Sequence, residues 1–190
     1  MDFSGEGIST PKERGEWAEA RFLAKAAQEG FRVSKPWGDS ARYDFAVERE
    51  GRFLRIQVKS TVSRLRDGYR CLLQPPQAKE NPKKLYSAEQ VDFFAAYVIP
   101  EDAWYIFPAE VAVKMRGRAW LFPGSPGHKY EKYKEAWELL RAAAGGAVED
   151  EGCVEEEGVE MRAEVEGVSV GYDSDVVRGR IAACFARMRK

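Results

Sequence analysis

In residues 10–30 the polar and apolar positions follow the pattern of a capped helix. Thr10, Pro11 and Glu13 fit a capping box in which the proline takes the first helical position. An alanine-rich, helix-favouring stretch continues to residue 29, and Gly30 suits the position just after a last helical turn. The pattern therefore predicts an amphipathic helix over residues 11–29.

After Gly30 the pattern changes to short runs of β-branched and aromatic residues, which are typical of strands. The two stronger runs, 43–47 and 53–59, are joined by a tight connection at Glu50-Gly51. Weaker or later strands are expected at 31–33, 69–74, 93–99, 104–107 and 119–122. Prolines and lysines in the stretch 74–86 predict a loop.

Two further helices complete the predicted body of the protein. Pro108 can start a short helix that ends near Met115. The spacing of Tyr133, Trp137 and Leu140 predicts a longer helix over residues 130–143. A helix followed by several strands and then by helices predicts an α/β (α+β) domain, in which helices flank a mixed β-sheet.

The distribution of charge divides the chain at Ala144-Gly145-Gly146. Residues 1–143 carry a net charge of +4 and residues 144–190 a net charge of −5, which gives −1 overall. We expect a domain at 1–143, an acidic linker at 144–158, and a C-terminal extension at 159–190 whose patterns predict a strand and an amphipathic helix. A partner with negative charge is therefore expected to bind within the first three quarters of the chain.

The composition excludes several classes of protein. With 44% hydrophobic and 32% charged residues, the 190-residue chain can bury a core, which argues against wholesale disorder. No apolar run approaches the ~20 residues of a membrane helix, and the N-terminus lacks the apolar centre of a secretory signal. Three cysteines without a CxxC spacing argue against a disulfide scaffold or a cysteine zinc site. We therefore expect a cytoplasmic protein with no membrane partner.

Candidate chemistry is concentrated on the predicted hairpin and the first helix. Asp44 lies between two aromatic residues on one strand, and Gln57 and Lys59 share one face of the next strand because strand side chains alternate. Glu19 lies on or beside the apolar stripe of the first helix, where an unpaired carboxylate is costly, and Glu16 is the less favoured alternative. A carboxylate, an amide oxygen and an ammonium group would then meet at one end of the hairpin.

This combination suits phosphodiester hydrolysis. Mg²⁺ takes oxygen ligands, often one or two carboxylates together with substrate phosphate and water. A lysine beside the ion can orient a bound water, and hydrolysis needs that nucleophile as well as neutralisation of the charge that develops on phosphorus. In a purely structural interpretation, each residue is an ordinary surface group, and Glu19 pairs with Arg42 or Lys59.

The order of these motifs resembles the PD-(D/E)XK nuclease superfamily, over roughly residues 10–140. The resemblance is carried by the segment from Gly15 to Glu19, by Gly30-Phe31, by Asp44 and by Gln57-Val58-Lys59-Ser60. In the Holliday-junction-resolvase and intron-endonuclease branches the acid falls four residues after the glycine, which selects Glu19. Gln57 stands where Asp or Glu is usual, and in this it resembles the group I intron-associated homing endonuclease branch.

The resemblance implies a restriction-endonuclease-like core and a metal-dependent DNA endonuclease. Asp44, Gln57 and Glu19 would hold Mg²⁺ (or Mn²⁺), together with the carbonyl of Val58, and Lys59 would position the attacking water. Members of the superfamily usually act as homo-oligomers, so a dimer or tetramer is expected. Contacts to DNA phosphates are expected from residues that follow the motif, namely Ser60, Arg64, Arg66, Lys83 and Lys84.

Several alternatives stay open at this point. The enzyme could be a branched-DNA (Holliday junction) resolvase or a nuclease of defence or repair. Because Gln57 removes one negative charge from the metal site, a catalytically inactive nuclease-fold module that binds nucleic acid or protein is also compatible with the sequence. Basic residues at 116–132 could form a second contact surface, whereas Trp120 and Tyr130 are expected in the core.

Overall fold

The computed structural model describes residues 10–38, 40–75 and 86–145, and its first helix has the expected cap. Helix α1 spans Pro11–Gln28, with Thr10 as N-cap. The Thr10 hydroxyl accepts a hydrogen bond from the Glu13 amide at 3.2 Å, and the Glu13 carboxylate accepts one from the Thr10 amide at 2.8 Å. Ala18, Phe22 and Ala26 form its buried face. The predicted capping box and helix are therefore confirmed.

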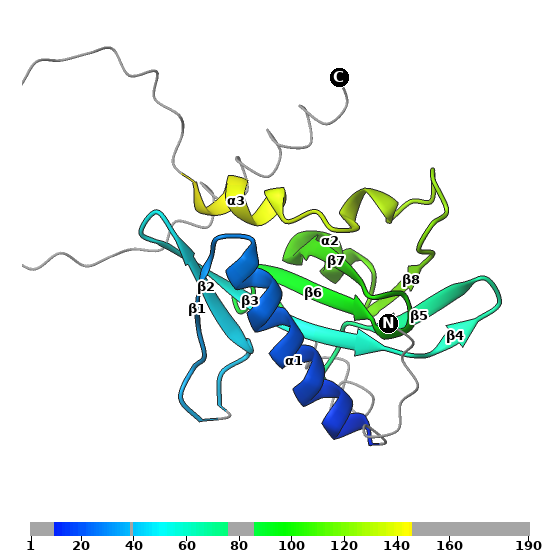
Figure 1. The fold of residues 1–190 in the computed structure, drawn as a ribbon, viewed down its shortest axis with the longest axis horizontal. Coiled ribbons are helices and arrows are strands. Elements are labelled where there is room, and N and C mark those ends of the chain that lie inside the picture. The colour runs from blue at the N-terminus through cyan, green and yellow to red at the C-terminus, as the bar shows by residue number, and fades with distance from the viewer. Residues whose placement is uncertain (1–9, 39, 76–85, 146–190) are drawn as a thin grey trace, which may run out of the picture.

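A mixed five-stranded sheet forms the centre of the molecule (Figure 1). Its strand order is β1-β2-β3-β6-β7, and only the central pair, β3 with β6, is parallel. Strands β2 and β3 form the predicted hairpin, with Phe45 opposite Ile56. The bounds of the strands are β1 Arg32–Ser34, β2 Phe45–Arg49, β3 Arg52–Thr61, β6 Phe93–Val98 and β7 Ala103–Pro108.

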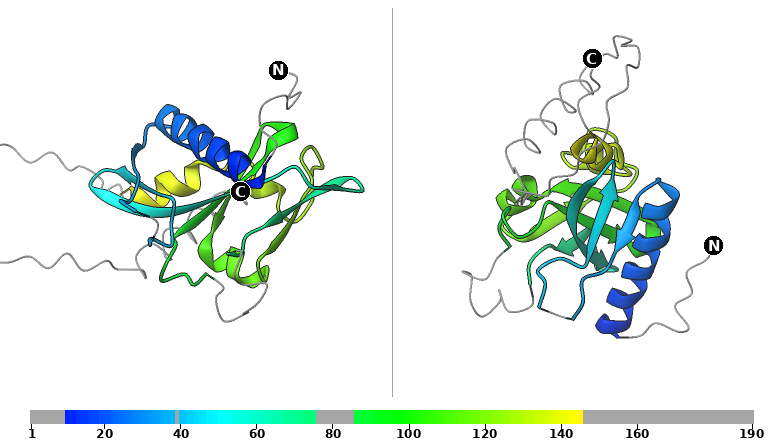
Figure 2. Two further views of the ribbon diagram at one scale, coloured as in Figure 1. Left: turned by 90° about the horizontal axis from the view of Figure 1, so that it is seen from below. Right: turned by 90° about the vertical axis from the view of Figure 1, so that its left-hand side faces the viewer.

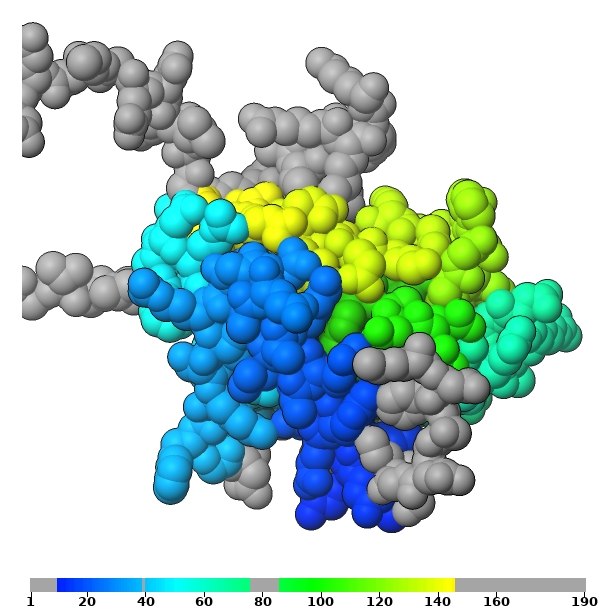
Figure 3. All heavy atoms as spheres, viewed as in Figure 1, coloured from blue at the N-terminus to red at the C-terminus, as the bar shows by residue number. Residues whose placement is uncertain are grey.

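A second, three-stranded antiparallel sheet continues from the end of β3. It has the order β4-β5-β8, with β4 at Arg64–Leu65, β5 at Gly68–Leu72 and β8 at Arg118–Leu121. The Thr61 hydroxyl donates to the Arg70 carbonyl at 2.8 Å and accepts from the Ser63 amide at 3.0 Å, which fixes this sheet to β3. The hairpin of β4 and β5 protrudes from the body of the molecule (Figures 1 and 3).

Helices α1 and α3 (Glu138–Ala144) pack together over one face of the central sheet (Figure 2). Phe22 of α1 meets Phe45, Trp104 and Trp137 at ring-centroid distances of 5.4, 5.7 and 5.9 Å. Such aromatic pairs each add roughly 0.5–1.5 kcal/mol to the gain from burial. The remaining helices are short: η3 Ile99–Glu101, α2 Ala109–Lys114 and η4 Glu131–Tyr133.

An ion pair joins the two central strands of the sheet. The Asp92 carboxylate accepts hydrogen bonds from the main-chain amide, Nε and Nη2 of Arg55 at 2.6, 3.0 and 2.9 Å. Only 6% of the Asp92 side chain is exposed. The pair links β3 to the start of β6, next to the strands that carry the candidate site.

Two expectations from the sequence are wrong. The helix predicted over 130–143 is divided into η4 and α3, because Glu135 has a φ of 50°, which no α-helix accepts. Glu135 bonds the edge of β7 instead: its amide donates to the Trp104 carbonyl at 2.8 Å, and its carboxylate accepts from the Trp104 amide at 2.7 Å. Trp120 was expected in the core but is 42% exposed on β8.

The predicted mixed sheet flanked by helices is confirmed. The acidic linker and the C-terminal strand and helix expected beyond residue 145 lie outside the described residues. Among the helices of the described residues, none has the length and apolar character needed to cross a membrane.

Candidate active site

Asp44 lies where the pairing of β2 with β3 ends. Its amide still donates to the Ile56 carbonyl, at 2.9 Å, in continuation of the ladder. Its side chain then turns to β3 and accepts a hydrogen bond from the Val58 amide on Oδ2, at 2.7 Å. Beyond this point β2 offers no main-chain carbonyl to the Val58 amide. The Asp44 carboxylate accepts the hydrogen bond instead, since a buried main-chain amide needs an acceptor. Asp44 directly precedes β2, one residue outside the strand in which it was expected.

Gln57 of β3 is buried, with 5% of its surface exposed, and its amide faces Asp44. Nε2 donates to Asp44 Oδ2, and also to the Val58 carbonyl at 3.3 Å. Both neighbours are acceptors, so the amide presents its nitrogen rather than the oxygen that the sequence led us to expect. Within the part of the chain that the structure describes, no hydrogen-bond donor reaches the other oxygen, Asp44 Oδ1.

Glu19 reaches the same region from α1, but its partner differs from the one predicted. Its carboxylate pairs with Lys35 at 2.7 Å, and not with Arg42 or Lys59. The Lys35 ammonium also lies 5.7 Å from the ring centroid of Phe45. Glu16, the less favoured alternative, lies on the exposed side of α1 beside Lys12, at 3.9 Å.

Lys35 is a member of the site that the sequence analysis missed. It directly follows β1, which runs antiparallel to β2, with Ser34 opposite Ala46. This register brings the residues after Ser34 beside Asp44 at the start of β2. In the sequence Lys35 is only a lysine after a weak strand pattern. Its place in the site follows from the pairing of β1 with β2, which the sequence alone does not show.

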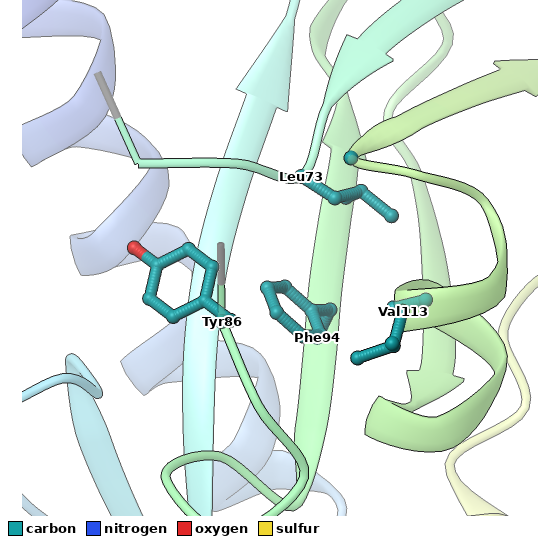
Figure 4. Close-up of a pocket in the computed structure, with 6 residues that line it drawn as sticks. Leu73, Tyr86, Phe94 and Val113 are labelled. Atoms are coloured by element: carbon teal, nitrogen blue, oxygen red, sulfur yellow. The ribbon is translucent and has the colours of Figure 1, made fainter. Parts of the chain in front are cut away.

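Lys59 extends from β3 toward Tyr86, with its ammonium 5.4 Å from the ring centroid. Tyr86 packs edge-on against Phe94 at 5.3 Å, beside a cavity of about 20 Å³ that is also lined by Leu73 and Val113 (Figure 4). A cavity of this size has room for about one water molecule, and its lining is mostly apolar. The cavity is therefore a small packing gap beside Tyr86 and not a binding site for a ligand.

The electrostatics of Asp44 tie these residues together. The pKa of Asp44 is raised to about 6; burial is the largest cause, and the charge of Glu19 acts in the same direction. The charge of Lys59, the hydrogen bond from Val58 and the charge of Lys35 act in the opposite direction on this pKa. Two carboxylates and two ammonium groups therefore share the site, and their formal charges cancel when Asp44 is ionised.

The donor atoms of the site fit a hard divalent cation. Glu19 and Asp44 offer carboxylate oxygens, Val58 a main-chain carbonyl, and Gln57 an amide oxygen if its amide rotates; Mg²⁺ and Mn²⁺ prefer such oxygen ligands. The number of acidic ligands is small: nowhere in residues 10–38, 40–75 and 86–145 do three His, Cys, Asp or Glu side chains gather in a metal-binding group. The set matches an ion that keeps water and takes substrate oxygens as its remaining ligands.

The described residues that were expected to contact DNA follow Lys59 along β3 and into β4. Ser60 follows Lys59 on β3, and Arg64 and Arg66 lie on β4 and its turn, beyond the end of β3. Lys83 and Lys84 lie outside the described residues.

Two solved structures are similar to this chain. Among solved structures, a bacterial homing endonuclease, I-Ssp6803I, is similar with a TM-score of 0.59 and 26% sequence identity, over 70% of this chain and 92% of that chain. A Holliday junction resolvase, Hjc of Archaeoglobus fulgidus, gives a TM-score of 0.36 and 20% identity, over 51% of this chain and 74% of that chain. The search of curated proteins found no match.

A family model described as PD-(D/E)XK endonuclease matches residues 9–140. The resemblance seen in the sequence and the restriction-endonuclease-like core expected from it are thereby confirmed. Since the matched segment makes up more than half of the 190 residues, the chain belongs to the PD-(D/E)XK endonuclease family.

Proposed function

We propose that this protein is a metal-dependent DNA endonuclease that hydrolyses phosphodiester bonds. The observation that carries the proposal is the grouping of Glu19, Asp44, Gln57 and the two lysines at the start of β2, in a chain of a nuclease family. The site contains two carboxylates, one of which is buried and has a raised pKa, and a lysine lies on the neighbouring strand. Side chains with pKa values shifted in this way cluster at functional sites.

Each residue has a distinct role in this proposal. Asp44, Glu19 and the Val58 carbonyl would hold Mg²⁺ or Mn²⁺, and Gln57 would join them by turning its amide oxygen inward. The bound cation would lower the pKa of a water and neutralise charge on the scissile phosphate. Lys59, held beside Tyr86, would hold the attacking water or a phosphate oxygen through its ammonium protons. Lys35 would keep the Glu19 carboxylate oriented through their ion pair.

The similarity to a homing endonuclease supports the same class of activity for this chain. A homing enzyme is expected to recognise a long duplex site and to cut both strands. Because one active site of this kind cuts one strand, a cut through both strands requires two copies of the chain. We therefore propose a homo-oligomer, whose mass light scattering of the full chain would measure.

Gln57 favours one candidate function of a different class. Its nitrogen, rather than its oxygen, faces Asp44, and it contributes no negative charge to hold a cation. A member of the family that binds DNA without cutting it is compatible with this orientation.

Cleavage of supercoiled plasmid DNA in Mg²⁺ or Mn²⁺ tests the proposal. We expect the wild type to nick or linearise the plasmid, and Asp44→Asn and Lys59→Met to do neither. Lys114→Met, which removes an exposed lysine from α2, is the matched control and should cleave normally. Equal activity in all four proteins would refute the proposed site. Retained DNA binding without cation binding or cleavage in the wild type would favour the inactive module.

A further inference from the structure

The three-stranded sheet presents an outer face with an unusual composition. The register places Arg70 opposite Trp120 and Leu72 opposite Arg118, and all four side chains are exposed. The alternate residues of the same strands, among them Tyr69, Cys71 and Leu121, are buried against the body. The outer side of β5 and β8 is therefore a block of two arginines, a tryptophan and a leucine, which we call the arginine face.

The charge around this face is almost entirely positive. Besides Arg70 and Arg118, the strands and their turns carry Arg66 and Arg116, as well as Arg64 on the other side of the ribbon opposite Tyr69, and Asp67 is their only acidic residue. None of these five arginines forms an ion pair with a residue in the described part of the chain, whereas Arg21, Arg55 and Arg141 each do. Guanidinium groups that gather on one small sheet suit a partner with many negative charges.

We propose that the arginine face binds duplex DNA next to the site of cleavage, an inference that rests on the proposed endonuclease function. Arginines provide the phosphate contacts that dominate affinity for DNA, and an antiparallel ribbon such as the protruding β4–β5 hairpin fits the major groove (Figure 3). A second copy of the chain is a poor occupant, because a two-fold interface through this face would bring its arginines against each other.

The sheet is also held in a defined place relative to the candidate active site. Strand β3 runs without interruption from Gln57 and Lys59 to Thr61, which is hydrogen-bonded to Arg70. Lys59 and Thr61 are two residues apart, about 7 Å at the rise of a strand, and the Thr61 hydroxyl bonds the Arg70 carbonyl. The arginine face would therefore hold the duplex within about half a helical turn, or about 17 Å, of the phosphate at Lys59.

Fluorescence anisotropy with a labelled duplex of mixed sequence, about three helical turns long, tests this inference. The full chain is titrated in EDTA, between about 0.05 and 0.3 M KCl, so that no cleavage occurs. The test variant is Arg70→Gln with Arg118→Gln. The matched control, Arg49→Gln with Arg52→Gln, removes the same charge from the β2–β3 hairpin at the opposite end of the molecule (Figure 1). Thermal unfolding of each protein verifies the fold.

We expect the test variant to reduce the slope of log affinity against log salt by about 1.8, since each phosphate contact contributes about 0.9. If the affinities converge near 1 M salt, the loss at 0.1 M is roughly 60-fold. Trp120→Ala should lower the affinity for DNA by a factor that does not change with salt concentration, because an aromatic contact releases no counterions. The control variant should keep the slope of the wild type.

The outcomes separate this inference from the proposed function. If the wild type binds the duplex and the test variant binds with the same slope and affinity, the arginine face is not a DNA surface, while the proposed endonuclease stands. If the wild type binds no duplex at any salt concentration, both fail. A loss of affinity and slope confined to the test variant, with an unchanged melting temperature, supports the inference.

Discussion

Replacement of Asp44 by asparagine should make the metal-free protein more stable, although it removes the residue most central to the proposed site. The carboxylate is buried, and its pKa is raised to about 6, first by burial and then by the charge of Glu19. Asparagine keeps an oxygen that can accept the Val58 amide, so the end of β2 should keep its geometry. What the substitution removes is a charge that the folded state disfavours.

The magnitude follows from the two pKa values. An aspartate with a pKa of 3.8 in the unfolded chain and about 6 in the folded chain costs about 3 kcal/mol of stability when it is fully ionised in both states. Because the folded state binds the proton more tightly, the wild type loses this stability as the pH rises from about 4 through 6. Asp44→Asn has no such loss, so its advantage over the wild type should grow by about 1.4 kcal/mol between pH 5 and pH 8.

Urea unfolding in EDTA, at several values between about pH 5 and pH 8, measures this difference. Asp67→Asn is the control, because Asp67 is an exposed aspartate on the turn between β4 and β5. Its free energy of unfolding should differ from that of the wild type by an amount that hardly changes with pH. A pH-independent difference for Asp44→Asn, or one that shrinks as the pH rises, would refute the reasoning about burial.

Three further predictions concern neighbouring groups. Lys59→Met removes a charge that lowers the pKa of Asp44, so the midpoint of this pH-dependent loss of stability should move above pH 6 in the same urea experiment. Gln57→Glu places a third acid beside Asp44, so melting temperatures should show lower stability in EDTA and a larger gain on addition of Mg²⁺. Asp92→Asn should cost about 3 kcal/mol in urea unfolding, at the low end for a broken buried pair because the Arg55 side chain is 26% exposed.

The sequence was sufficient for those parts of the site that depend on local rules. The capping box fixes where α1 begins, and the turn at Glu50-Gly51 fixes the register of the hairpin. Once the register is known, strand alternation puts Gln57 and Lys59 on one face and Asp44 beside them. These relations follow from sequence spacing, which explains why Asp44, Gln57 and Lys59 could be expected near one another before the fold was known, whereas Glu19 was selected by the apolar stripe of its helix and by the family resemblance.

Other features depend on contacts between distant segments, which spacing does not reveal. Lys35 joins the site because β1 pairs with β2, and the weak strand pattern at 31–33 gave no register. Glu135 breaks the predicted helix because both its amide and its carboxylate bond Trp104 at the edge of β7 that no other strand of the sheet pairs with. The helical spacing of Tyr133 and Trp137 was real, but the sheet edge provided a better partner for the backbone between them.

Gln57 connects the fold of the site to its proposed chemistry. Its nitrogen bridges Asp44 and the Val58 carbonyl, which are two of the groups whose oxygens would hold the proposed cation. In the proposed mechanism a proton, an amide group and a metal ion would therefore compete for the same carboxylate. The amide lowers the cost of burying Asp44 without adding charge, and the proposed cation would have to displace it. A glutamate at this position would hold the proposed ion more tightly but would place two carboxylates against each other whenever no ion is bound, so Gln57 would give lower affinity for metal and higher stability of the fold.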